Sequence, residues 1–263
     1  MVGFGRRGLK FLIGIMALAL VLGASLGALG WSLGYFRPAG AALTYTVQKG
    51  ENFAALANKL QSQGIIHSSR ALRWYVNFFA PQKPLQRGEF ALYQGMPVPE
   101  VVRALTEGKP IEHKFTVLEG ENIFQIGESL EAKGFVKKAD FLVAARSAEL
   151  LQLIPWTGSG ARPTSIEGYV FPDTYMLQKI FTAKEIAVVM VQHFKEVFRS
   201  LEAEMKESVL AKEFGFTPHQ HVILASIVEK ETGSGQERPL IASVFLNRLR
   251  KRMRLQTDPT IVY

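Results

Sequence analysis

The sequence predicts an α+β protein with a single N-terminal transmembrane helix, then a region of strands and helices, and then a mixed α/β domain. Three observations lead to this prediction. Residues 11–36 carry no charge, one strand and helix pattern occurs twice within residues 45–136, and residues 155–263 contain several helix patterns. Hydrophobic residues make up 48% of the 263 residues, which is too apolar for a disordered chain.

The composition excludes several kinds of chemistry. The chain has no cysteine, so disulfides, thiolate metal sites and cysteine nucleophiles are excluded. It has five histidines and neither a Gly-x-x-x-x-Gly-Lys-Ser/Thr loop nor a His-Glu-x-x-His helix, so we expect no metal and no cofactor. The formal net charge is +8, but part of it flanks the apolar segment, and we expect no nucleic-acid partner.

The apolar segment at residues 11–36 is long enough to cross a bilayer, which takes roughly 20 helical residues. Three cations precede it: Arg6, Arg7 and Lys10. Only Arg37 follows it directly, and this bias predicts that residues 1–10 are cytoplasmic and that residues 37–263 are extracytoplasmic. A cleaved signal peptide is the alternative, because small residues in the second half of the segment could admit a peptidase.

The chain contains an internal repeat at residues 45–66 and 115–136. Tyr45–Asn52 aligns with Phe115–Asn122, and both copies contain Thr-Val-x-x-Gly-Glu-Asn. Each copy predicts a strand, a glycine turn, an amphipathic helix capped by its asparagine, and a short apolar strand. Between the copies, residues 88–105 predict a strand followed by a short helix.

A segment rich in aromatic and acidic residues follows a glycine and proline linker at residues 155–163. Residues 166–177 read Ile-Glu-Gly-Tyr-Val-Phe-Pro-Asp-Thr-Tyr-Met-Leu. Glu167, Asp173 and Tyr175 have the chemistry of a polysaccharide cleft, in which aromatic faces contact sugar rings and carboxylates bind hydroxyl groups. The alternative is a turn that closes a sheet, with the Pro-Asp pair at its corner.

A helix predicted over residues 219–231 carries the candidate catalytic acid. The capping box Thr217-Pro-His-Gln220 starts this helix. At about 100° per residue, Glu231 shares the azimuth of Leu224, so its carboxyl group is expected to project from an apolar stripe. Such surroundings favour the protonated acid that glycosidic cleavage requires. Glu229 lies about 200° away, and the alternative is that both glutamates are surface charges.

The last part of the chain predicts a helix over residues 237–253 that ends in basic residues, as the helix dipole favours. The polar turn that follows contains Gln256 and Asp258, and residues 261–263 read as the start of a strand. Since a domain rarely ends on such an apolar stub, we expect the sequence to be truncated at its C-terminus.

The repeated Thr-Val-x-x-Gly-Glu-Asn opening resembles that of LysM modules, which are small folds that bind polymers of N-acetylglucosamine. The resemblance covers about the first half of each copy. It implies a LysM-like region over residues 37–154, and the alternative is a structural unit that does not contact sugar.

Four segments together resemble the endolytic murein transglycosylases of the MltG (YceG-like) family. They are Glu167–Tyr175 (EGYVFPDTY), Ala225–Thr232 (ASIVEKET), Ser243–Leu249 (SVFLNRL) and Met253–Thr260 (MRLQTDPT). Members of this family are bacterial, single-pass proteins of the inner membrane. The resemblance implies that residues 155–263 belong to a catalytic domain, which is incomplete here because the family continues past Tyr263.

The resemblance also implies a reaction, which is cleavage of the β-1,4 bond between N-acetylmuramic acid and N-acetylglucosamine in nascent glycan strands, leaving a 1,6-anhydro end. Glu231 is implied as the catalytic acid and base, because lytic transglycosylases place a small hydroxyl residue, here Thr232, after the acid. The implied supporting or substrate-binding residues are Glu229, Glu167, Asp173, Tyr175, Asn247, Gln256 and Asp258. The implied partners are peptidoglycan strands, the cytoplasmic membrane and peptidoglycan synthases.

Two other functions remain open on the sequence alone. A non-catalytic scaffold of the wall-synthesis machinery would bind peptidoglycan through the LysM-like region and dock partners through the second half. A true hydrolase would use a second carboxylate such as Asp258 to activate water. The basic residues on either side of Met253, where the family has a small or polar turn, imply different local substrate contacts, and the truncation implies weak or no turnover by this chain.

Overall fold

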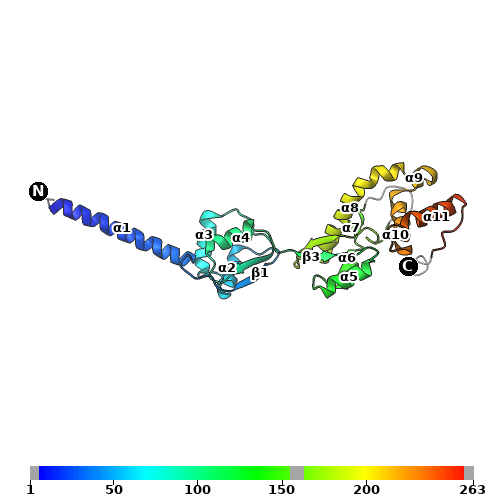
Figure 1. Ribbon diagram of the computed structural model, residues 1–263. Helices are drawn as coiled ribbons and strands as arrows, with labels where there is room; N and C mark the ends of the chain where they lie inside the picture. Colours follow the sequence, from blue (N-terminus) through cyan, green and yellow to red (C-terminus); the bar gives the residue numbers. More distant parts are fainter. Residues whose placement is uncertain (1–5, 155–162, 258–263) are drawn as a thin grey trace. The chain divides into compact units, whose positions relative to one another are not determined.

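The structure, a computed structural model, describes residues 6–154 and 163–257 (Figure 1). It divides into two compact units, Met1–Ile111 and Glu112–Tyr263, and each has its own hydrophobic core. Nearly all of the expected linker lies outside the described residues, and so do Asp258 and the strand expected over residues 261–263.

The first helix, α1, spans Arg6–Leu33, and its part from Lys10 to Leu33 is long and apolar enough to cross a membrane. Large apolar side chains are exposed along this part, which is unfavourable in water and suits a helix that faces lipid. The helix ends at Leu33 rather than at Phe36, the last residue of the uncharged segment, and a turn follows it. Leu33 itself is buried in the core of the first unit.

The rest of the first unit packs helices against a two-stranded antiparallel sheet. Its elements are β1 (Ala42–Val47), α2 (Phe53–Ser62), α3 (Ser69–Phe79), β2 (Gly88–Tyr93) and α4 (Val98–Glu107). The strand β1 pairs with β2 from Ala42 opposite Tyr93 to Val47 opposite Gly88. The strand and helix expected over residues 88–105 are therefore confirmed. Fully buried side chains of this core include Leu56, Leu60, Leu72, Leu92 and Leu105.

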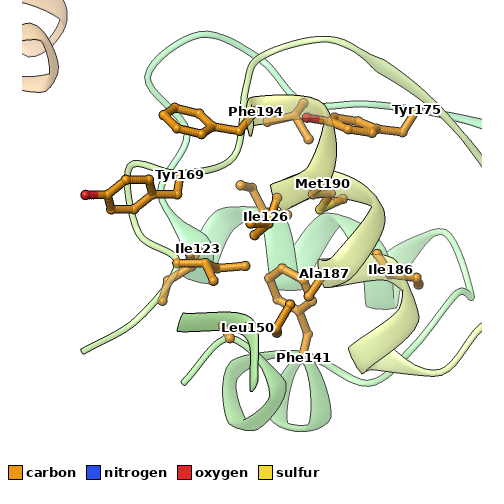
Figure 2. Packing of buried hydrophobic residues seen from close by; sticks show 14 of the residues in the cluster. Ile123, Ile126, Phe141, Leu150, Tyr169, Tyr175, Ile186, Ala187, Met190 and Phe194 are labelled. Carbon is orange, nitrogen blue, oxygen red and sulfur yellow. The ribbon is translucent and has the colours of Figure 1, made fainter. Parts of the chain in front are cut away.

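The second unit also contains one pair of antiparallel strands, with more helices around it. Its elements are β3 (His113–Thr116), α5 (Ile123–Ala132), α6 (Lys138–Ala144), α7 (Ala148–Leu151), β4 (Thr174–Leu177), α8 (Ala183–Glu207), α9 (Val209–Phe214), α10 (Pro218–Glu231) and α11 (Arg238–Arg250). Figure 2 shows Ile126 of α5, Phe141 of α6 and Met190 of α8 in the shared core. The mixture of helices and strands agrees with the predicted α+β class.

The two copies of the repeat form the same turn between strand and helix. In the first copy, Glu51 Oε2 accepts from the backbone N–H of Gln48 at 2.8 Å, and in the second copy Glu121 Oε2 accepts from that of Leu118 at 2.9 Å. The glycines of the two turns have φ values of 83° and 76°, a region that disfavours side chains. Asn52 and Asn122 cap α2 and α5 as predicted.

The short apolar strands expected at the end of each copy are not strands. Ile65 and Ile66 follow Gly64, whose φ of 73° ends the first helix, and both side chains are buried. Phe135 follows Gly134, with a φ of 70°, in the same way. These side chains are apolar because they fill the core beneath a helix end. Each copy then continues into a second helix, α3 or α6. The first returns directly in β2, and the second returns in β4 after the short helix α7.

The compact units divide after Ile111, whereas the sequence predicts a division between functional regions after residue 154. The physical reason is the pairing of β3 with β4, in which Thr116 meets Thr174 at a separation of 58 residues. The second copy of the repeat therefore shares a sheet and a core with the part that contains the family motifs. The assignment of a LysM-like region and a catalytic domain stays a prediction about function.

Candidate active site

The segment around Tyr169 holds the start of α10. The Tyr169 hydroxyl donates to Nδ1 of His219, and the two rings are stacked with their centroids 5.9 Å apart. Burial raises the pKa of Tyr169 to about 12 and lowers that of His219, so the hydroxyl keeps its proton and the imidazole is a neutral acceptor. A Cβ on Gly168 would lie 3.6 Å from the side chain of Val222, so the same segment also packs against the side of α10.

The predicted capping box at the start of α10 is confirmed. Thr217 Oγ1 accepts from the backbone N–H of Gln220, the Gln220 side chain accepts from that of Thr217, and Pro218 is the first helical residue. His221, one turn into the helix, has its Nε2 2.8 Å from the hydroxyl of Ser208. These contacts fix the direction in which α10 leaves the segment and hence where its C-terminal end lies.

Glu231 is the last residue of α10, and its side chain is exposed. The expected burial of this carboxyl group among apolar side chains is not found. Only Leu224 and Val228 are buried along α10, and Glu231 lies beyond the last of them, where no described element covers it. Within residues 6–154 and 163–257, Glu231 makes no hydrogen bond or ion pair. Its carboxyl group is therefore accessible to a ligand.

Glu229 belongs to a charge network. Nη2 of Arg238, at the start of α11, lies 3.0 Å from Glu229 Oε1 and 2.8 Å from Glu119 Oε2. The Glu229 side chain is 27% exposed, and that of Glu119 is 66% exposed. A carboxylate that accepts from a guanidinium is committed to that charged pair. Glu229 thus suits a supporting role better than that of a proton donor.

Two cations attach the α10 and α11 ends to the turn between β3 and α5. Besides the Arg238 contact, Lys230 Nζ donates to the carbonyl oxygen of Gly120 at 2.5 Å. The first copy of the repeat has Lys49 where the second has Glu119, so its turn has the opposite charge at the position that Arg238 binds. The turn of the second copy is therefore specialised to hold the helix that carries Glu231.

The turn after Glu231 is fixed by a buried hydroxyl group. Thr232 is 9% exposed, and its Oγ1 donates to Glu237 Oε2 at 2.7 Å and accepts from the backbone N–H of Ser234 at 3.0 Å. The residue that follows the candidate acid thus orders the segment between α10 and α11.

Two of the predicted substrate-binding residues lie on α11 and on the segment after it. Asn247 is exposed, and its Oδ1 accepts from Nη1 of Arg250 at 3.4 Å. Gln256 is exposed and has a left-handed φ of 51°. The described contacts do not join Asn247 or Gln256 to Glu231, so their role stays a prediction. The third such residue, Asp258, lies outside the described residues.

Glu167 and Tyr175 make supporting contacts. Glu167 Oε2 accepts at 3.0 Å from the backbone N–H of Ile123, the first residue of α5. Tyr175 is 4% exposed, and its hydroxyl donates to the carbonyl oxygen of Phe171. A ring buried to this extent offers no face to a sugar, because it belongs to the core shown in Figure 2. Both residues shape the sheet and the α5 end rather than a cleft surface.

Asp173 pairs with α8. Its Oδ2 lies 2.7 Å from Nε2 of His193, and the hydrogen bond from the backbone N–H of Thr174, followed by that with His193, lowers the pKa of Asp173. Asp173 and His193 line a shallow hollow together with Gln192 and Glu196. The described contacts do not connect this hollow to Glu231.

Arg238 and His219 are not among the predicted site residues. A signal for Arg238 existed, because a cation in the first turn of a helix is disfavoured by the helix dipole and indicates a partner outside the helix. No local pattern connects His219 with Tyr169, which lies 50 residues earlier.

The geometry offers acid and base chemistry at one accessible carboxyl group. Glu231 can give a proton to a bound ligand or take one from it, and its neighbour Thr232 holds the adjoining turn. Among the described residues, no group of three or more His, Asp or Glu side chains is arranged to hold a metal ion.

Comparison with known proteins identifies the class. The sequence model of the YceG-like family matches residues 45–263, so the chain belongs to the YceG-like family. A crystal structure of a yceG-like protein from Listeria monocytogenes is similar, with a TM-score of 0.50 and 29% sequence identity over 84% of this chain and 75% of that one.

Curated relatives carry a functional name. The endolytic murein transglycosylase of Bacillus subtilis (strain 168) is 27% identical over 82% of this chain and 61% of the relative. That of Streptococcus pneumoniae serotype 2 (strain D39 / NCTC 7466) is 27% identical over 84% of this chain and 43% of the relative. The chain thus spans less than two thirds of the length of these relatives.

Proposed function

We propose that this chain is a membrane-anchored endolytic transglycosylase of peptidoglycan. In this proposal it cleaves the β-1,4 bond between N-acetylmuramic acid and N-acetylglucosamine within nascent glycan strands and leaves 1,6-anhydro ends. The family and the names of the relatives support the class of reaction. The structural observation that carries the proposal is the accessible Glu231 at the end of α10, inside the segment ASIVEKET.

The proposed reaction needs one carboxyl group and two proton transfers. The Glu231 carboxyl group first protonates the glycosidic oxygen as the bond to the muramic acid breaks. The resulting carboxylate then removes the proton from the 6-hydroxyl of the same muramic acid, whose oxygen attacks the anomeric carbon and closes the anhydro ring. Glu231 returns to its protonated state, and no water is consumed.

The charge network around Arg238 supports a division of labour between the two glutamates. Glu229 is paired with Arg238, which also binds Glu119, whereas Glu231 has no such ion pair with a described residue. We assign Glu229 to positioning the end of α10. Glu167, Asp173 and Tyr175 support the elements on which α10 rests, while Asn247, Gln256 and Asp258 are the proposed contacts to sugar.

The proposed location is the bacterial cytoplasmic membrane. The helix α1 supports this location. More cations lie before its apolar part than directly after it, and this bias favours an N-terminus in the cytoplasm. The LysM-like region would hold the glycan strand, and peptidoglycan synthases are the proposed partners. A peptidoglycan-binding scaffold without catalysis is the competing function.

The test is a digest of purified peptidoglycan by the natural full-length protein, with the fragments identified by mass spectrometry. Anhydromuramoyl products are expected, and Glu231→Gln should lower their rate of formation by about 10²–10⁴-fold, the usual contribution of a general acid. The matched control is Glu229→Gln, which should reduce the rate by less.

Three other outcomes would contradict the proposal. A reducing muramic acid end would show hydrolysis in place of lytic cleavage, and equal rates with Glu231→Gln would remove Glu231 from the chemistry. If neither protein gives products, the scaffold function is favoured.

A further inference from the structure

The helix α3 carries an exposed aromatic face. Trp74, Phe78 and Phe79 are 40%, 68% and 62% exposed, although aromatic side chains of this size are usually covered. The Trp74 ring lies 5.3 Å from that of Phe78 and 5.7 Å from that of Phe79, measured between centroids. We call these three side chains the α3 aromatic patch. The patch is a single continuous group and not a set of scattered residues.

The charge of α3 accompanies this patch. The helix contains Arg70 and Arg73 and no Asp or Glu. Arg70, Trp74 and Phe78 follow one another at four-residue spacing, so they form one stripe along the helix, on the side away from buried Leu72. Arg70 is exposed and makes no ion pair with the part of the chain that the structure describes. Arg73, by contrast, donates to Asn58 Oδ1 at 2.9 Å. A helix with aromatic residues and an unpaired cation on its exposed side has the composition of an interfacial helix.

The position of α3 in the chain brings this patch close to the end of α1. The rings of Trp31, in the last turn of α1, and His67, just before α3, are 6.3 Å apart. Leu33 of α1 and Leu72 of α3 belong to the same core, and Figure 1 shows α3 beside the C-terminal end of α1. Because Leu33 is buried in this core, α3 stays near the point where α1 ends.

The end of α1 has the composition of a membrane boundary. Exposed aromatic side chains gather there at Trp31, Tyr35 and Phe36, and such residues are enriched where a transmembrane helix meets the headgroups. An 11-residue helix such as α3 is roughly 16 Å long, so its aromatic patch lies within a short distance of that boundary.

From this geometry we propose that α3 lies on the outer surface of the bilayer, with Trp74, Phe78 and Phe79 inserted among the headgroups and Arg70 facing lipid phosphate. The proposal rests on α1 being the membrane anchor of the proposed function. It adds a second contact, through which the first unit is held flat against anionic lipid. The cationic end of the stripe favours such a surface over a neutral glycan strand.

The test uses Trp74 of α3 as the only tryptophan of the full chain. The substitutions Trp31→Phe and Trp156→Phe leave Trp74 as the sole tryptophan. The protein is reconstituted in vesicles of phosphatidylethanolamine and phosphatidylglycerol that contain a lipid brominated near the headgroup. We expect a blue-shifted emission that loses most of its intensity to the brominated lipid and is protected from aqueous acrylamide. Phe78→Ser with Phe79→Ser should weaken the quenching, whereas Phe124→Ser, an exposed phenylalanine of the second unit, should leave it unchanged.

Flotation of the same vesicles separates the two ways of failing. If the chain floats with the vesicles but Trp74 is quenched by acrylamide and not by brominated lipid, α1 is an anchor and the α3 proposal is wrong. Protection of Trp74 by added N-acetylglucosamine oligomers, without quenching by lipid, would overturn it in favour of a glycan. If the chain does not float, the anchor and the α3 contact are both wrong.

Discussion

Two glutamates separated by one residue have different surroundings, and the difference comes from their position around the helix. Glu229 faces the start of α11 and meets Arg238, whereas Glu231 closes α10 on a side that no described element covers. The same side-chain chemistry is thus used once for an ion pair and once for an accessible acid.

At the residue scale, the pair of Tyr169 and His219 makes the free energy of unfolding depend on pH. Burial lowers the pKa of His219, so the unfolded chain takes up a proton near pH 6.5 while the folded chain resists it. Stability is therefore complete above about pH 6.5 and falls on acidification below it. Asp173, whose pKa is lowered, loses its own contribution only at more acidic pH.

Thermal unfolding of the full chain in detergent, measured between about pH 5 and pH 8, checks this expectation. His219→Asn keeps an acceptor for the Tyr169 hydroxyl but cannot take up the proton, so its unfolding midpoint should change less over this range. An equal pH dependence in both proteins would show that His219 does not control it.

At the scale of elements, the turn between β3 and α5 is the support of the candidate active site. Lys230 and Arg238 bind this turn from the two ends of the segment between α10 and α11. The position of Glu231 thus depends on a contact between parts of the chain more than 100 residues apart, since Arg238 and Glu119 are separated by 119.

Removal of the Arg238 guanidinium tests this support. Arg238→Met should lower the unfolding midpoint of the second unit and reduce the proposed transglycosylase activity, because Glu229 and Glu119 then repel each other without a cation between them. Adding Glu229→Gln to this variant should recover part of the midpoint. If the double variant is no more stable than Arg238→Met, the network is not what holds α10.

The helices and their caps could be predicted from the sequence because the signals are local. Asn52, Asn122 and Thr217 each bind a backbone N–H two or three residues ahead, and their roles follow from residue type and spacing. The pairing of β3 with β4 could not be predicted, because β4 starts 86 residues after β2 (174 − 88) although the copies are offset by 70 (115 − 45). The exposure of Glu231 could not be predicted, because the azimuth of a residue on a helix does not say whether another element covers that side of the helix.

At the scale of the whole molecule, one repeated pattern serves two different units. Both copies begin with a strand, the same turn and two helices and return in a strand, but the second has the short helix α7 before that strand and shares its core with α8. We expect each unit to respond separately to damage in its own core, since Leu60 and Leu130 occupy the same place in the two copies and are both fully buried.

Substitution of these two leucines by alanine provides a matched pair. Each change should cost about 2–5 kcal/mol, as for other buried leucines. Hydrogen exchange followed by mass spectrometry should show faster exchange over residues 42–107 for Leu60→Ala and over residues 113–250 for Leu130→Ala. Faster exchange across both ranges for either variant would mean that the units unfold together.

The burial of Leu33 also bears on how a shorter, more soluble version of the protein can be made. The next residue, Gly34, has a φ of 90°, and a Cβ there would be in ordinary contact with the backbone of Pro97, at 3.5 Å. A chain that starts after residue 37 loses this cover and leaves an apolar gap where Leu33 was, which favours aggregation. A boundary that keeps the last turn of α1, with its outward-facing apolar residues made polar, retains the complete core of the first unit.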